Sequence, residues 1–212
     1  MRVAVEESGS GAGPGHAAGS QPGTVRRVHL AQVNVARLRA PLDSPQLAEF
    51  VAALEPINAL GDASPGFVWR LQTDNGDATA VQVFDDDSFI VNLTVWESIE
   101  ALAEFAYRSP HREVMRRRRE WFEKMVDAYL ALWWVPVGHL PTVNEAEERL
   151  LHLRRHGPTP YAFTFRTPFA LPGGESIDRR PLGLSDGLKR EIRSSGRVLV
   201  SPGVEHAEHT QH

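Results

Sequence analysis

The chain of 212 residues carries a formal net charge of −4 and contains no cysteine. The absence of cysteine excludes disulfides, thiolate catalysis and Cys-ligated metal sites, and the mildly acidic balance gives no positive field favouring a nucleic acid or an anionic membrane. No run reaches the roughly 20 apolar residues of a membrane span, and the N-terminus lacks the apolar segment of a signal peptide. We therefore expect a cytoplasmic protein with no nucleic-acid or membrane partner.

The composition divides the chain into three parts. Residues 1–24 contain six glycines and few large apolar side chains, which predicts a disordered N-terminal arm. Residues 25–167 hold all the strong periodic patterns and are expected to form one domain. Residues 168–212 are polar and rich in glycine, which predicts a largely disordered tail. The histidines near its end could bind nickel or zinc adventitiously, and no pattern in the chain indicates a biological metal site.

Two spacings of apolar residues predict the secondary structure. Alternation of apolar and polar side chains predicts strands over residues 28–35, 67–72, 79–84, 89–96 and 130–137, with a possible short addition over 161–166. Helical spacing predicts helices over residues 45–61, 99–107 and 143–156, and a further helical segment from the Ser-Pro break before His111 toward Tyr129. The expected N-caps are Ser44, Ser98 and Thr142. Pro56 should kink or divide the first helix.

Two of the predicted strands, over residues 28–35 and 89–96, are polar on one face and apolar on the other. Their shared polar face would carry Gln32, Asn34, Asn92, Thr94 and Trp96. Trp133 and Trp134 are consecutive in the last strand and must point to opposite faces of the sheet.

The order of these elements predicts an α+β protein of ferredoxin-like βαββαβ topology with an antiparallel sheet and an extra hairpin strand after the second strand. Two helices would cover one sheet face and leave the polar face open. A second copy of the sheet would cover that face, so we expect a homodimer, formed through Asn34, Asn92 and Trp96, that makes a dimeric α/β barrel. Such a barrel would enclose a small-molecule cavity in each subunit.

The basic run at residues 116–119 consists of four consecutive arginines. Clustered guanidinium groups could form an anion site. Glutamates four residues away from several of these arginines favour instead a solvated, ion-paired helix face.

The run VWESIEALAEFAYRSPH resembles a signature of the dimeric α/β-barrel proteins related to antibiotic-biosynthesis monooxygenases. The segments HLAQVNVARLRAPLD, INALGDASPGFVWRLQ, VNLTVWES and WWVP, in this order, resemble an uncharacterised bacterial family of that group, a domain of unknown function. The resemblance covers residues 28–165 and implies the ferredoxin-like fold.

The resemblance also implies catalytic residues. Cofactor-independent monooxygenases of the group, and its haem-degrading branch, use an Asn, a Trp and a His, for which the candidates here are Asn34, Trp96 and His111. Trp96 could form a flat wall for an aromatic ligand, Asn34 or Asn92 could bond a phenolate or carbonyl oxygen, and His111 could move a proton near neutral pH. The sequence departs from the haem-degrading pattern, because His111 has no firm alignment with the haem-ligating histidine of that branch, and haem binding is left open. The leading hypothesis uses no bound metal or flavin, so no cofactor is expected.

Each of these three residues also has a purely structural interpretation. Trp96 could be a core or interface side chain, Asn34 could bond neighbouring backbone, and His111 could be an exposed residue at a helix start.

Four further residues are candidates for ligand binding. Gln32, Asn92 and Thr94 share the polar face with Asn34, and Arg70 would need a carboxylate from the protein or from a ligand if it faces the cavity. The leading hypothesis is a cofactor-independent, monooxygenase-like enzyme that acts on an aromatic or polycyclic small molecule. The alternative is a non-catalytic barrel that binds or senses such a ligand.

Overall fold

The computed structural model describes residues 27–73, 78–79, 83–170 and 190. Its elements in chain order are β1 (Val28–Arg37), η1 (Pro45–Leu47), α1 (Ala48–Asp62), β2 (Phe67–Arg70), β3 (Phe89–Trp96), α2 (Ile99–Arg108), α3 (His111–Trp121), β4 (Leu130–Pro136) and α4 (Val143–His156). Residues 1–24, and all of 171–212 except residue 190, lie outside the described residues, so the expectation of disordered arms stays a prediction.

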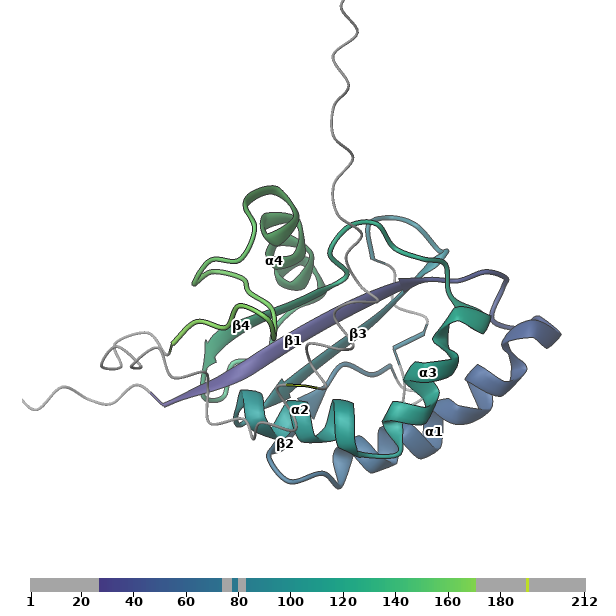
Figure 1. Cartoon of the computed structure of the whole chain (residues 1–212), viewed down its shortest axis with the longest axis horizontal. Coiled ribbons are helices and arrows are strands. Elements are labelled where there is room, and N and C mark those ends of the chain that lie inside the picture. The colour runs from purple at the N-terminus through teal and green to yellow at the C-terminus, as the bar shows by residue number, and fades with distance from the viewer. Residues whose placement is uncertain (1–26, 74–77, 80–82, 171–189, 191–212) are drawn as a thin grey trace, which may run out of the picture.

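The four strands form a sheet in the order β2-β3-β1-β4, and every neighbouring pair is antiparallel. Figure 1 shows α1, α2 and α3 together on one side of this sheet and α4 on the other. With α2 and α3 counted as one interrupted helix, the order of elements is βαββαβ. The predicted α+β, ferredoxin-like fold is therefore confirmed.

The two faces of the sheet are built from alternate residues of the same strands. On one face, the apolar side chains of the strands pack against α4 in a cluster that includes Val33, Leu93, Trp133 and Leu150, all at most 1% exposed. On the other face, Trp96 and Leu30 pack with Leu102 of α2 and with Phe163. Trp133 and Trp134 point to opposite faces, as predicted.

The polar face is the one that the helices of the same chain cover. Asn34 and Trp96 line a cavity beneath α1, α2 and α3, and Trp96 is only 1% exposed, whereas Asn92 lines the same cavity but is exposed. The predicted homodimer contact is therefore wrong at Asn34 and Trp96, because helices of the same chain already cover them. The error came from assigning the helices to the apolar face, which α4 covers instead.

Strand β2 departs from simple alternation. Phe67 pairs with Trp96 and Trp69 pairs with Val95, so the register shifts at Val68. This bulge places Phe67 and Arg70 on the cavity face, although alternation assigns them to opposite faces.

Helix boundaries differ from the prediction in three places. Helix α1 is continuous through Pro56 and is preceded by a separate 3-10 turn, so the proline does not divide it. Ser44 precedes that turn without a side-chain capping bond, whereas Ser98 and Thr142 cap α2 and α4 as predicted. Helix α3 ends at Trp121 rather than running toward Tyr129.

The described residues of two predicted short strands form only isolated bridges. Residues 80–82 of the expected hairpin strand lie outside the described residues, and Val83 forms only an isolated bridge with Asp86. In the expected addition over 161–166, Phe163 and Leu132 exchange backbone hydrogen bonds of 2.8 and 2.9 Å at the outer edge of β4. No helix in the described part of the chain has the length and apolar character to span a membrane.

Candidate functional site

A cavity of about 160 Å³ lies between the polar sheet face and helices α1, α2 and α3. Its lining includes six residues that the sequence singled out: Asn34, Arg70, Asn92, Thr94, Trp96 and His111. Gln32, the seventh, is not part of the lining and lies behind it, 6% exposed. The structure thus brings the candidate residues together within one chain, without a second subunit.

The floor of the cavity is a directional series of hydrogen bonds across β1 and β3. Trp96 Nε1 donates to Thr94 Oγ1 (2.9 Å), and Thr94 Oγ1 donates to Gln32 Oε1 (2.7 Å). Gln32 Nε2 then donates to Asn34 Oδ1 (3.2 Å). Gln32 lies directly opposite Thr94 in the antiparallel pairing, which is why the two side chains meet. These buried polar groups therefore have partners, as a stable interior requires.

One wall of the cavity is a stack of aromatic rings. Trp96 stacks on Phe105 with 5.2 Å between ring centroids, and Phe105 stacks on His111 at 4.8 Å. Phe67 meets Trp96 in a T-shaped arrangement with 5.2 Å between ring centroids. Helix α1 adds an apolar wall with Phe50, Ala53, Leu54 and Ile57. Flat aromatic surfaces combined with an apolar wall suit a planar, largely apolar ligand.

His111 is placed by the break between α2 and α3. Ser109 Oγ donates to the Phe105 carbonyl (2.6 Å) and accepts from the His111 backbone N–H (3.1 Å), which fixes the turn. The ring Nδ1 donates to the Ala106 carbonyl across 3.4 Å, since a carbonyl can only accept. Among the described residues, Nε2 has no hydrogen-bond partner.

Burial lowers the pKa of His111 below its usual 6.5, and the hydrogen bond to Ala106 opposes this shift. The imidazole is therefore neutral at pH 7, with its proton on Nδ1 and a free electron pair on Nε2. A neutral imidazole of this tautomer can accept a proton from a ligand.

Arg118 is a cavity residue that the sequence interpretation missed. Its Nη1 donates to the Tyr129 hydroxyl (3.1 Å), and its guanidinium lies 5.7 Å from the centre of that ring. It forms no ion pair with any carboxylate in the described parts of the chain. Burial raises the pKa of Tyr129 and raises that of Tyr107 to about 12, so both phenols stay neutral and do not cancel the cation.

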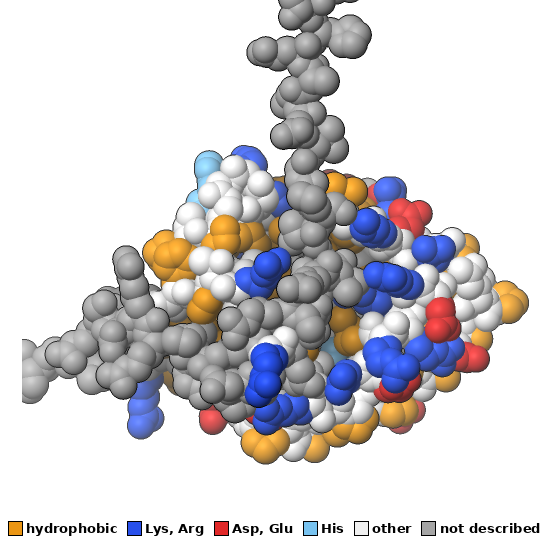
Figure 2. Space-filling view, viewed as in Figure 1, with side chains coloured by type: hydrophobic (Ala, Val, Ile, Leu, Met, Phe, Trp, Pro, Cys, Tyr) orange, Lys and Arg blue, Asp and Glu red, His pale blue; other side chains and the backbone are white. Residues whose placement is uncertain are grey.

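Two neighbours of Arg118 are ion-paired as predicted, but with glutamates three residues away or on α1 instead of four residues away. Arg116 pairs with Glu113 at 2.8 Å, and Arg117 pairs with Glu120 and Glu49. Figure 2 shows basic side chains gathered over α2 and α3 on the visible face. A signal for Arg118 was present, because it stands seven residues after His111 and therefore on the same helix face.

Arg70 obtains its carboxylate from the protein. Its Nε and Nη2 donate to the two carboxylate oxygens of Asp62 at 2.8 and 3.2 Å. The guanidinium side chain is 16% exposed, so it forms part of the cavity wall as one half of an ion pair. Asn92, by contrast, is exposed and lies where the cavity opens to solvent.

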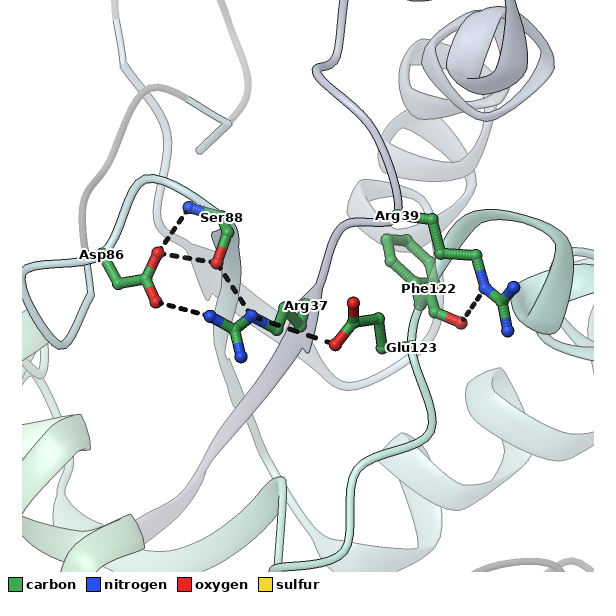
Figure 3. A network of polar contacts seen from close by, with 6 residues as sticks. All are labelled: Arg37, Arg39, Asp86, Ser88, Phe122 and Glu123. Carbon is green, nitrogen blue, oxygen red and sulfur yellow. Dashed lines mark hydrogen bonds and ion pairs between the residues drawn. The ribbon is translucent and has the colours of Figure 1, made fainter.

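A charged network ties the strand end near the cavity to two loops (Figure 3). Arg37 donates to Ser88 Oγ (3.0 Å) and to Asp86 Oδ2 (3.2 Å), and lies 3.9 Å from a Glu123 carboxylate oxygen. Hydrogen bonds from the Ser88 hydroxyl and backbone lower the pKa of Asp86. The charges are exposed and stabilise the fold little. Arg39 Nε in the same view donates to the backbone carbonyl of Phe122 (3.0 Å), another residue of the cavity lining.

No group of three or more His, Cys, Asp or Glu side chains is placed to bind a metal ion among the residues that the structure describes. The tail histidines His206, His209 and His212 lie outside those residues.

Comparison with known proteins identifies the family. A model of the family described as domain of unknown function DUF3291 matches residues 29–179, and the chain belongs to that family. The family match confirms the predicted resemblance to an uncharacterised family, a domain of unknown function, and the strand order confirms the predicted ferredoxin-like fold.

Similar solved structures share little sequence with this chain. A protein of unknown function from Nitrosomonas europaea is 12% identical, with 55% of this chain and 96% of that chain covered and a TM-score of 0.34. Rv0793 from Mycobacterium tuberculosis is 15% identical, with 54% and 99% covered and a TM-score of 0.34. A Streptomyces coelicolor monooxygenase solved with nanaomycin D is 16% identical, with 55% and 95% covered and a TM-score of 0.32. A search of curated proteins found no significant match.

Proposed function

We propose that the cavity binds an aromatic or polycyclic small molecule and that the protein oxidises it as a cofactor-independent, monooxygenase-like enzyme. The observation that carries the proposal is the convergence of Asn34, Trp96 and His111 on one cavity within a single chain. These are the residue types that the family resemblance associates with such chemistry.

The geometry suits a substrate that supplies its own electrons. Nε2 of neutral His111 would take a proton from a phenol or from an activated ring carbon, and Arg118 would stabilise the resulting anion. The electron-rich ring carbon would then reduce dioxygen. In the balanced reaction a ring CH2 group and O2 become a carbonyl group and water, so the substrate is the reductant and dioxygen the oxidant.

A second candidate function is non-catalytic binding or sensing of the same kind of ligand. One observation favours it: among the described lining residues His111 is the only histidine, and the lining contains no Asp or Glu. Catalysis would therefore depend on one base, whereas the aromatic wall and the hydrogen-bonded floor suffice for binding.

Oxygen uptake with anthrone, a reduced polycyclic phenol tautomer, separates the two functions. We expect uptake by the wild type and a loss of about a hundredfold or more in His111→Ala. His156→Ala, an exposed histidine on α4, is the matched control and should retain full activity. Binding without turnover would favour the second function, and no binding of any aromatic probe would refute both.

We retain a cytoplasmic homodimer as a proposal about assembly and location. The surface of Asn34 and Trp96 is excluded as its contact, because that surface lines the cavity. Light scattering of the purified chain at micromolar concentration measures the mass directly, and a monomeric value would refute the dimer.

A further inference from the structure

We infer that Gln32 and Thr94 are positioning residues that fix Asn34 with its amide N–H groups toward the cavity, so that the site selects ligands presenting an acceptor oxygen there. This inference rests on the proposed function, because it names the polarity of the ligand that the same cavity binds.

The direction of the hydrogen bonds follows from the first donor. An indole Nε1–H can only donate, so Thr94 Oγ1 must accept from Trp96, and the single hydroxyl hydrogen of Thr94 goes to Gln32. Gln32 therefore presents Oε1 to Thr94 and Nε2 to Asn34. A side-chain amide has one oxygen and one NH2 group, so each residue in the series determines the orientation of the next.

Asn34 is the end of this series. Its Oδ1 is occupied by Gln32 Nε2, and its Nδ2 has no hydrogen-bond partner among the described residues. Asn34 belongs to the cavity lining while Gln32 does not. The free Nδ2–H2 group is thus the polar group that Asn34 offers to a ligand, and it requires a carbonyl, phenolate or carboxylate oxygen as its partner.

Because the hydrogen-bonded series is buried, its direction discriminates between ligands with an acceptor and ligands with a donor. Gln32 is 6% and Thr94 8% exposed, so water cannot readily replace a broken bond in the series. Turning Asn34 to accept a donor from the ligand would leave its Oδ1 bond to Gln32 broken and two amide NH2 groups facing each other. Binding of a ligand with a donor at this position is weakened by both the broken bond and the facing NH2 groups, whereas a ligand with an acceptor oxygen causes neither.

Two uncharged probes of the same shape test the selection. 2-Acetylnaphthalene carries a carbonyl oxygen where 2-isopropenylnaphthalene carries a CH2 group. We expect the wild type to bind the ketone about three- to tenfold more tightly, the range of one neutral hydrogen bond. Because both probes are neutral, Arg118 contributes little to the ratio.

Variants of the series test its role. Gln32→Leu and Thr94→Val interrupt the series and should bring the ratio of the two affinities to within about twofold of one, because Asn34 can then turn either way. Thr94→Ser keeps the hydroxyl and should preserve the wild-type ratio. If these residues have only a structural role, the variants should weaken binding of both probes equally and leave the ratio of the two affinities unchanged.

The measurement remains informative if an interrupted variant fails to fold. In wild-type protein, binding of the ketone should shift the side-chain NH2 resonances of Asn34 in a nitrogen-proton correlation spectrum, and Asn34→Ser identifies those peaks by their loss. Equal affinities for the two probes, an unchanged ratio in folded Gln32→Leu, or unshifted Asn34 resonances would each overturn the inference. Only failure to bind either probe would also count against the proposed function.

Discussion

The two faces of the sheet solve the same packing problem in different ways. The face beneath α4 is filled with aliphatic side chains and Trp133, and its central residues Val33, Leu93 and Leu150 are 1% exposed or less. The face beneath α1 to α3 instead carries a line of polar groups and leaves a cavity of about 160 Å³. Both faces come from the same strands, so the difference is set by alternate residues alone. One face supplies stability, and that stability lets the other remain incompletely filled.

The largest expected effect comes from opening a void in the filled face. Leu150→Ala should lower the free energy of unfolding by about 2 to 5 kcal/mol, because Leu150 is fully buried and its neighbours can collapse only partly. Urea unfolding measures this change. Binding of 2-acetylnaphthalene to the folded fraction should be unchanged. Ile57→Ala, on the cavity wall, is the matched control. It should cost less stability but weaken binding of 2-acetylnaphthalene.

A smaller loss of stability is expected for Trp96, which is both a buried side chain and part of the cavity lining. Trp96→Phe keeps most of the stacked ring but removes the Nε1 donor, and should cost about 1 to 3 kcal/mol of stability and weaken probe binding. Trp134→Phe also removes an indole donor, to the Phe169 carbonyl, but lies outside the cavity lining. If both variants lose stability and neither loses binding, Trp96 is a core residue only.

The two capped helices provide a matched pair across the sheet. Ser98 accepts from Ala101 N–H (3.1 Å) at the start of α2, and Thr142 accepts from Glu145 N–H (3.2 Å) at the start of α4. Replacing either by Ala should cost about 1 kcal/mol. Only Ser98→Ala should also weaken probe binding, because α2 carries the cavity residue Phe105. Equal effects on binding would show that the faces are coupled through the sheet.

The smallest effect is a pH dependence of stability. His111 has a pKa below 6.5 in the folded state because burial disfavours its charged form. Its contribution is therefore fully present above about pH 6.5 and is lost as the pH falls toward the folded-state pKa, since the unfolded chain then binds the proton more tightly. Unfolding midpoints between pH 5 and 7.5 should show a shallower slope for His111→Phe than for the wild type.

His152 requires its own control in that experiment. Burial and the nearby His156 also lower the pKa of His152, so it contributes in the same direction. His152→Gln should remove only its own share of the slope. A slope unchanged in His111→Phe would contradict the burial of His111 in its neutral form.

Local patterns predicted the elements of this fold well because each depends on neighbours in sequence. The alternation over residues 89–96 predicted both the strand and the contents of its two faces. Ser98 and Thr142 were predicted as caps from residue type and spacing, and both accept the expected bond. The polar line on β1 and β3 likewise led to the cavity residues before any contact was known.

What failed depended on contacts between distant segments. Alternation cannot tell which sheet face a helix will cover, so the polar face was assigned to a dimer contact instead of to α1, α2 and α3. Arg118 lies in a run of arginines in which Arg116 and Arg117 pair with Glu113, Glu120 and Glu49, and only the packing of α3 on the sheet distinguishes it. The Asp62 partner of Arg70 required knowing where α1 ends relative to β2.

The bulge at Val68 determines which side chains of strand β2 face the cavity, and simple alternation in the sequence does not reveal it. Val68 is the one extra residue between two paired positions, and it is 38% exposed. Deleting Val68 would leave the pairs of Phe67 with Trp96, Trp69 with Val95 and Arg70 with Thr94 consecutive along both strands, so the bulge would disappear. Phe67 and Arg70 would then share the cavity face by simple alternation, and Arg70 would keep its partner Asp62. A single codon deletion at this exposed position would thus make the edge strand regular without exchanging its inside and outside.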